Sequence, residues 1–277
     1  MAFVIDFTDS QIQTFAVPLV VSAIAVGLLR YLMGPWMGVL LGSLGLAIGF
    51  LASLLLVQGF PGWPPANALA MLPYIILAGM VAGALVDQAD NPIGLVRPLY
   101  IGLPMVIIFW LGVTFYSAFR DITGTVPYAL LMIAGIIALQ RLHDDRDDGI
   151  ASPVALLAAL AGLAVVGLVS GTSLARFPIA AAMAILGFLL WNWPRCRFPW
   201  STAGTLSIGG TYLALIAFIF LQDRSMAIPL VISFAVFFVH PLTERVFMPE
   251  PRMSAVVQLV VSLVPIGLAG AAANYLV

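Results

Sequence analysis

His240 is the first residue whose chemistry stands out, because it lies beside a long apolar stretch of the chain. It follows Phe237 and Phe238 and precedes Pro241. A histidine can ligate a haem or a chlorophyll-type pigment, and it can relay a proton because it changes charge near physiological pH. The same position suits an interfacial residue bonded to a nearby carbonyl or water. We therefore take His240 as a candidate cofactor-binding residue, and the cofactor itself is unknown.

Two charged residues follow His240 closely enough to share its membrane face. Glu244 and Arg245 lie one helical turn further along the chain. An enzyme that acts on a lipid or isoprenoid substrate needs polar groups gathered at one depth. These three residues are therefore the candidate site for such an enzyme.

The densest run of charges is His143-Asp144-Asp145-Arg146-Asp147-Asp148. Carboxylates and an imidazole could hold a divalent cation. The run lacks the glycine and the final glutamate of an EF-hand loop, and a solvated turn fits the same residues. The sequence therefore predicts no metal site here.

The familiar catalytic motifs are missing from the sequence. It contains no G-x-S-x-G, H-E-x-x-H, C-x-x-C or P-loop pattern. The one cysteine, Cys196, excludes an intrachain disulfide and a multi-cysteine metal site. We therefore assign no catalytic residues and favour a non-enzymatic role over an enzymatic one.

Glycines recur at four-residue spacing in two apolar stretches, where they would let helix backbones approach closely. Near them, residues 58–66 hold three prolines and Trp63, which could anchor the chain or dock a partner. The residues predicted to serve packing or partner contact are Gly38, Gly42, Gly45, Gly49, Gly79, Gly83 and Trp63.

The passage through Leu72-Pro73 resembles segments of uncharacterised multi-pass bacterial inner-membrane proteins. The resemblance covers about a fifth of the chain. It implies a bacterial inner-membrane location and carries no known activity, cofactor or site residue.

The elements that must position these residues follow from composition. Of 277 residues, 62% are hydrophobic and 8% charged, whereas soluble domains are about 25% charged. A helix needs about 20 apolar residues to cross the hydrocarbon, and open sheets do not survive in lipid. The sequence thus predicts an all-α polytopic transmembrane bundle of about ten spans. We expect them near residues 11–30, 36–57, 67–86, 98–118, 122–140, 151–170, 174–193, 203–221, 225–241 and 253–275.

The chain has no stretch long enough for a soluble domain, so we expect one transmembrane domain over residues 1–277. The pattern P-x4-A-x3-G-L begins at Pro18 and again at Pro153. If each half of the chain has five spans, an odd number, the two halves enter the membrane from opposite sides. They would then be related as an inverted 5+5 repeat, as in many transporters. The two halves would be residues 1–145 and 146–277.

Arginine placement predicts the orientation. The sequence has eleven basic residues, all arginine, and most lie in or beside the odd-numbered connections between spans. Because basic residues collect on the cytoplasmic side, the 141–150 loop should face the cytoplasm and both termini should face outward.

Three functions remain open at this point. Kinked apolar spans favour a transporter or permease for a small, weakly polar or lipid-like solute, although no charged residue lies at the centre of a predicted span. Short loops and glycine-rich faces suit a non-catalytic structural or assembly subunit of a larger membrane complex. The third alternative is the lipid-processing enzyme.

The expected partners are the lipid bilayer and either membrane proteins or further copies of this chain. No basic excess indicates nucleic acid, since the net charge is −1.

Overall fold

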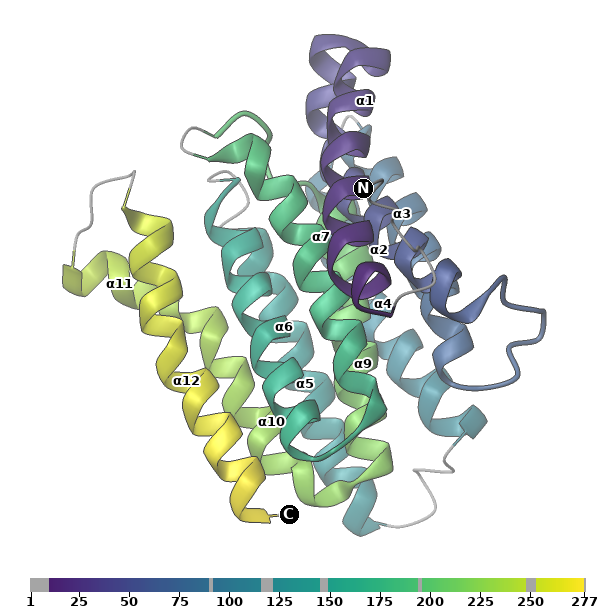
Figure 1. Cartoon of the computed structure of the whole chain (residues 1–277), viewed down its shortest axis with the longest axis vertical. Coiled ribbons are helices and arrows are strands. Elements are labelled where there is room, and N and C mark those ends of the chain that lie inside the picture. The colour runs from purple at the N-terminus through teal and green to yellow at the C-terminus, as the bar shows by residue number, and fades with distance from the viewer. Residues whose placement is uncertain are drawn as a thin grey trace, which may run out of the picture.

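The computed structural model describes residues 10–89, 92–115, 122–144, 149–193, 196–247 and 253–276. These residues form helices and no strands, packed side by side as a bundle (Figure 1). Nine of the described helical stretches are long and apolar enough to cross a membrane. The predicted all-α polytopic bundle is therefore confirmed, and the chain is a multi-pass membrane protein.

The helices follow one another with short connections. In chain order they are η1 (Ile12–Ala16), α1 (Val17–Leu40), α2 (Leu44–Gln58), η2 (Leu69–Met71), α3 (Leu72–Asp87), α4 (Pro92–Phe115), α5 (Ile122–Asp144), α6 (Ala151–Val169), η5 (Ser173–Ala175), α7 (Arg176–Asn192), α8 (Thr202–Gly204), η6 (Thr205–Gly209), α9 (Gly210–Gln222), η7 (Arg224–Met226), α10 (Ala227–Ser233), η8 (Phe234–Phe238), α11 (Val239–Phe247) and α12 (Ser254–Leu276).

The predicted second span differs most from the structure. Helix α1 breaks at Gly34, where φ is +75°, and the chain turns back on itself. A Cβ at Gly38 would lie 2.8 Å from the Cα of Arg30, so only glycine permits this close return. The returning segment is interrupted again before α2 begins at Leu44. The second crossing is thus built from two pieces, and α2 alone, with 15 residues, is shorter than a full span.

The predicted ninth span is longer than expected. A continuous apolar helical stretch runs from Arg224 to Val246 and includes a 3-10 segment, η8, between α10 and α11. Beyond that segment α11 runs sideways and away from the bundle (Figure 1). The predicted span ended at Pro241 because proline often follows the end of a helix. Proline is also common at the start of a helix, which is its position in α11, and the sequence alone does not distinguish the two.

The stretch Thr202–Gln222 lies at the centre of the bundle, with 94% of its apolar window buried. Asp87, the last residue of α3, caps it: the two carboxylate oxygens accept hydrogen bonds from the backbone N–H groups of Thr202 and Ala203, each at 3.0 Å. A carboxylate suits this end because a helix N-terminus carries unpaired donors and partial positive charge.

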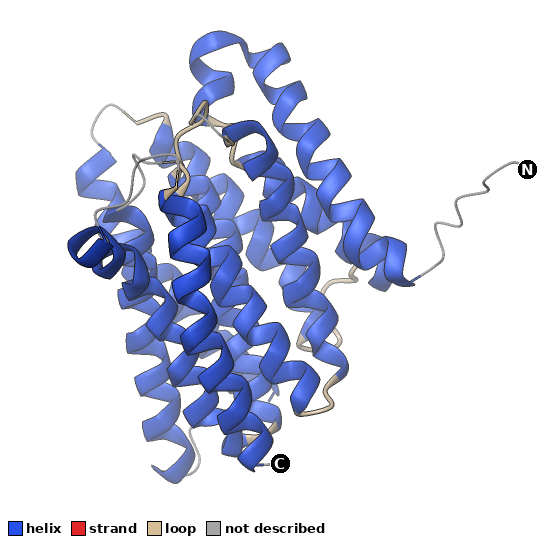
Figure 2. Cartoon of the chain, turned by 60° about the vertical axis from the view of Figure 1, so that its left-hand side comes forward, coloured by secondary structure: helices blue, strands red, loops and turns tan. Residues whose placement is uncertain are grey.

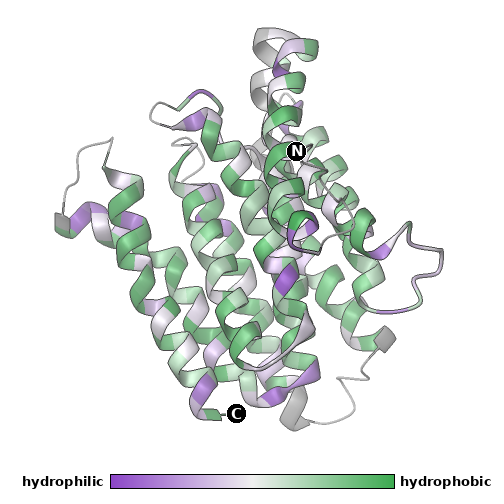
Figure 3. Ribbon diagram, in the orientation of Figure 1, coloured by the Kyte–Doolittle hydropathy of each residue, from purple (hydrophilic) through white to green (hydrophobic). Residues whose placement is uncertain are grey.

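The outer faces of the bundle are apolar. Phe109 on α4 and Leu263 on α12 are each more than half exposed, and hydrophilic residues gather toward the helix ends (Figure 3). Such faces contact the lipid bilayer, which replaces water around them. The first helix begins near mid-height of the bundle, and α12 ends at its lower side (Figure 2).

Candidate functional site

The turn between α5 and α6 is the place where polar side chains from several helices meet. Ser152, at the start of α6, donates from its hydroxyl to the carbonyl of Leu142 at 2.8 Å. Gln258 of α12 donates to the carbonyl of Ala151 at 3.1 Å. These bonds join the ends of α5, α6 and α12 on one side of the bundle, which we call the polar end.

Three side chains of α5 reach this polar end. The His143 ring lies 5.1 Å from the ring of Tyr100 in α4, and its Nδ1 is 3.4 Å from the Tyr100 hydroxyl. The guanidinium of Arg141 lies 5.5 Å from the centre of the Phe238 ring, a cation–π distance. Asp144 is exposed. The predicted charge run continues through residues 145–148, which lie outside the described residues.

Asn192, at the end of α7, fixes the far side of the turn. Its amide nitrogen donates to the carbonyls of Gly149 and Phe198, both at 2.8 Å. Its amide oxygen accepts from the backbone N–H groups of Arg197 and Phe198, at 3.1 and 2.9 Å. The side chain is completely buried and all of its hydrogen-bonding capacity is used. Asn192 therefore locks the turn before α6 to the loop after α7.

Gly149 is the residue that allows this connection. Its φ is +59°, and a Cβ there would lie 2.5 Å from both the Cys196 sulfur and the Phe198 carbonyl oxygen. A side chain at this position would meet both a strained backbone and an occupied volume.

The structure places His240 in the first turn of α11, almost fully buried. Its Nε2 lies 3.5 Å from the Glu244 carboxylate, while its Nδ1 is buried and has no hydrogen-bond partner. Glu244 and Arg245 are exposed. Within the described part of the chain, no group of three His, Cys, Asp or Glu side chains is arranged to hold a metal ion. The cofactor role of His240 stays a prediction.

An apolar groove begins directly beside the polar end. It has a volume of about 450 Å³ and runs between α1, α6, α7 and α12. Ile150, Val154 and Leu157 line one wall, so the groove extends about 10 Å along α6 from the turn. Trp193 and Ala255 stand at the same end of the groove as Ile150. The groove is apolar along its length, and one end of it lies beside the polar end of the bundle.

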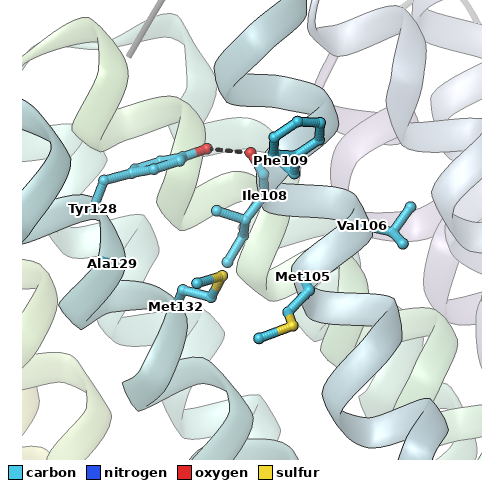
Figure 4. Close-up of a pocket in the computed structure, with 7 residues that line it drawn as sticks. All are labelled: Met105, Val106, Ile108, Phe109, Tyr128, Ala129 and Met132. Atoms are coloured by element: carbon cyan, nitrogen blue, oxygen red, sulfur yellow. Dashed lines mark hydrogen bonds between the residues drawn. The ribbon is translucent and has the colours of Figure 1, made fainter. Parts of the chain in front are cut away.

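A second groove, of about 360 Å³, lies between α4 and α5 (Figure 4). Met105, Phe109 and Met132 line it, and the Tyr128 hydroxyl points away to donate to the Ile108 carbonyl at 2.8 Å. The groove therefore offers apolar contact and suits only an apolar chain.

The predicted packing glycines lie at close approaches within the chain. A Cβ at Gly45 would meet Val26, one at Gly49 would meet Pro18 and Ser22, and those at Gly79 and Gly83 would meet the Thr202–Ser207 segment. Gly38, on the returning segment, faces the backbone of Leu29 and Arg30 before the break, and Gly42 is buried in the turn before α2. Trp63 is exposed and makes an edge contact with Tyr74. Whether any of them contacts a partner stays a prediction.

No family model matches the chain. A phospho-N-acetylmuramoyl-pentapeptide-transferase of Heliobacterium modesticaldum is 30% identical over 189 residues, which cover 65% of this chain and 52% of the relative. The chain spans about half the length of the curated relative it matches.

Sequence reasoning singled out the charge run next to this site but not Asn192. The charge run and the residues from His240 to Arg245 were visible as isolated polar groups. Asn192 was not singled out, because its partner Gly149 is 43 residues away in the chain. The signal that could have found it is an amide inside an apolar helix, which is expected to be bonded. The groove has no sequence signal, since its lining residues are ordinary span residues.

Proposed function

We propose that this protein is a membrane enzyme that acts on a lipid or isoprenoid substrate with a phosphorylated headgroup. The observation that carries the proposal is the apolar groove that begins at Ile150, next to Gly149 and to the end of α5. A lipid chain would lie in the groove, where it replaces bilayer contacts. Its headgroup would lie at the polar end, near Asp144 and His143.

The reaction class follows from the relative, whose name denotes transfer of a phospho-linked group. In such a transfer an oxygen of the lipid headgroup attacks phosphorus of a water-soluble activated donor. The new P–O bond forms, the donor's P–O bond breaks, and the leaving phosphate departs with the bonding electrons. Where the attacking group is a hydroxyl, His143 or a carboxylate of the turn would take its proton.

This proposal replaces the transporter as the preferred function. The grooves at the polar end and between α4 and α5 have apolar walls. Two hydroxyls of the central stretch are engaged inside the protein: Thr211 donates to the Ser207 carbonyl at 2.8 Å, and Ser207 donates to the Ala203 carbonyl at 2.6 Å. A lipid-like solute still suits the grooves, so transport of such a solute is the alternative outcome of the test. The subunit hypothesis would be favoured by stoichiometric membrane-protein partners.

The decisive experiment combines native mass spectrometry with a transfer assay. The protein is purified from its own membranes in mild detergent, and the mass of any bound lipid or partner is measured. It is then placed in nanodiscs with an isoprenoid phosphate and offered a panel of radiolabelled nucleotide-activated amino sugars, with and without Mg²⁺, a cation that carboxylates commonly bind. Transfer moves the label into the organic phase.

A matched pair of variants separates the site from general effects. Asp144→Asn removes the carboxylate at the end of α5, and Asp223→Asn removes one that follows α9 and lies outside the proposed site. We expect wild type and Asp223→Asn to transfer label and Asp144→Asn to lose at least about tenfold, the scale of one acid–base group. If purified protein carries no lipid and moves no label from the panel, the enzyme proposal fails. Accumulation of an unmodified lipid-like solute in sealed vesicles would support the transporter instead.

A further inference from the structure

The loop between α2 and α3 exposes two large aromatic side chains. We call residues 59–66 the aromatic loop. Phe60 is 89% exposed and Trp63 is 74% exposed, among the most exposed of the described aromatic residues. The loop extends sideways from the bundle rather than off its end (Figure 1, the blue loop at the right). Side chains of this size left uncovered on a protein mark a contact surface.

The aromatic loop is held in shape by Tyr74, in the first turn of α3. The Tyr74 hydroxyl lies 3.2 Å from the carbonyl oxygens of both Pro61 and Gly62 and donates to them. The Trp63 ring stands edge-on to the Tyr74 ring, with centres 5.4 Å apart. The prolines restrict the backbone further because each fixes its own φ. Phe60 and Trp63 are therefore presented by a braced loop.

The length of α3 sets the depth of this loop in the bilayer. Helix α3 has 16 residues between Leu72 and Asp87, so it is about 24 Å long. Asp87 lies at the polar end, and a carboxylate stays near water unless it is paired. The hydrocarbon core is about 30 Å thick, so Leu72 lies close to the opposite boundary of the bilayer. Any tilt of α3 would bring the aromatic loop deeper.

Charge also favours contact with lipid. No charged residue occurs between Arg30 and Asp87, so nothing in the aromatic loop requires bulk water. Trp is enriched at the membrane–water interface, because its ring prefers the headgroup boundary while its N–H finds a polar partner there. A protein partner would have to cover the same residues at a depth already filled by lipid.

We propose that the aromatic loop is a membrane-interface anchor that inserts Phe60 and Trp63 into the lipid leaflet opposite the polar end. The occupant of this surface is the boundary between headgroups and acyl chains of that leaflet. The anchor is independent of the proposed enzyme activity, because it lies on the other side of the membrane from the α5–α6 turn.

The test measures how lipid reaches Trp63. Wild type and Trp63→Phe are placed in nanodiscs that contain phosphatidylcholine brominated either near the carboxyl end or near the middle of its acyl chains. The chain has six tryptophans, and the difference between the two proteins isolates the fluorescence of Trp63. We expect the shallow bromines to quench most of this difference signal, and aqueous iodide to quench little of it.

A second variant guards against misfolding of the first. Phe60→Trp adds a reporter at the neighbouring exposed position and leaves Trp63 in place, and we expect the added signal to show the same quenching. Quenching by iodide alone would place the loop in water and overturn the proposal. Protection from both iodide and bromine would overturn it too, because a protein surface would then cover the loop.

Discussion

Asn192 shows how one side chain can hold two loops together. Its amide bonds to four backbone groups of the Gly149 turn and the Phe198 loop, and it is completely buried. An amide with fewer partners at this place would leave donors and acceptors unsatisfied, at a cost of about 1–3 kcal/mol each. Asn192 therefore contributes more to the stability of the polar end than a side chain of its size usually does.

We expect Asn192→Ala to lower the free energy of unfolding by about 2–4 kcal/mol, because several buried backbone groups lose their partner. Thermal unfolding in detergent, followed by tryptophan fluorescence, measures the change. The matched control is Asn67→Ala, since exposed Asn67 accepts one bond, from the Ala70 N–H at 2.8 Å. Equal losses of unfolding free energy in the two variants would contradict the stabilising role of the Asn192 hydrogen bonds.

Gly149→Ala tests the backbone of the same turn. Both Gly149 and Gly171 have positive φ, at 59° and 66°, but only Gly149 would bring its Cβ against Cys196 and Phe198. Alanine in this backbone region costs roughly 1–2 kcal/mol. We expect Gly171→Ala to lose about that much and Gly149→Ala clearly more, as measured by thermal unfolding. A larger loss of stability in Gly171→Ala than in Gly149→Ala would show that the close packing of Gly149 against Cys196 and Phe198 does not matter for stability.

At the scale of elements, the crossing of α3 with the central helix depends on small residues. A Cβ on Gly83 would overlap the Ala203 backbone, and one on Gly79 would lie 2.5 Å from the Leu206 carbonyl oxygen. Backbone atoms cannot move aside as a flexible side chain can. The close approach also brings Asp87 to the two N–H groups that it caps.

We expect Gly83→Ala to destabilise the bundle by about 1–3 kcal/mol, because the two helices must separate to admit the methyl group. Gly102→Ala on α4 is the control, since no atom lies within 4 Å of its Cβ position. In a helix such a change alone stabilises slightly, because alanine has the higher helix propensity. If Gly102→Ala destabilised the protein as much as Gly83→Ala, the close crossing of α3 with the central helix would not explain the effect.

The sequence predicted most spans well, because an apolar run of about 20 residues has few other uses. It placed the glycines near helix contacts but could not say which helix each one meets. The return at Gly34 falls in the predicted connection between the first and second spans. The interruption at residues 41–43 was missed, because these residues look like the rest of an apolar span. The 3-10 segment Phe234–Phe238 was missed because its residues are ordinary span residues.

At the scale of the whole molecule, the direction of the chain in the membrane stays a prediction from the arginines. Nine full spans and the shorter α2, with its preceding segment, give an even number of crossings among the described residues. An even number places both termini on one side. The single domain and the inverted relation between residues 1–145 and 146–277 also stay predictions.

We expect a reporter that is active only outside the cytoplasm to work after Val277 and to fail when the fusion follows Asp144. The reason is that arginines collect near the odd-numbered connections, which the positive-inside rule assigns to the cytoplasm. Enzyme activity of the two fusions in intact cells measures this. A reporter active only in the cytoplasm that works after Val277 would reverse the orientation.

Function was the hardest property to predict at this scale. Membrane residence follows from composition alone, but the groove exists only when α1, α6, α7 and α12 come together. Sequence reasoning ranked the transporter first because it saw kinked spans and isolated polar residues. The groove at Ile150 and the related transferase moved the preference to a lipid-processing enzyme.

The enclosed position of Thr202–Gln222 has a consequence for how the protein is made. This stretch is apolar enough to enter the bilayer by itself, yet 94% of its window is covered in the finished bundle. Segments on both sides of it in the chain supply that cover, including α3 before it and α10 after it. During synthesis it must therefore meet lipid first and exchange lipid for protein later. A ribosome stalled once Thr202–Gln222 has left its exit tunnel, while α10 is still inside the tunnel, would hold a chain whose central helix has part of its surface open to the bilayer. This is the stage at which a membrane chaperone would bind it.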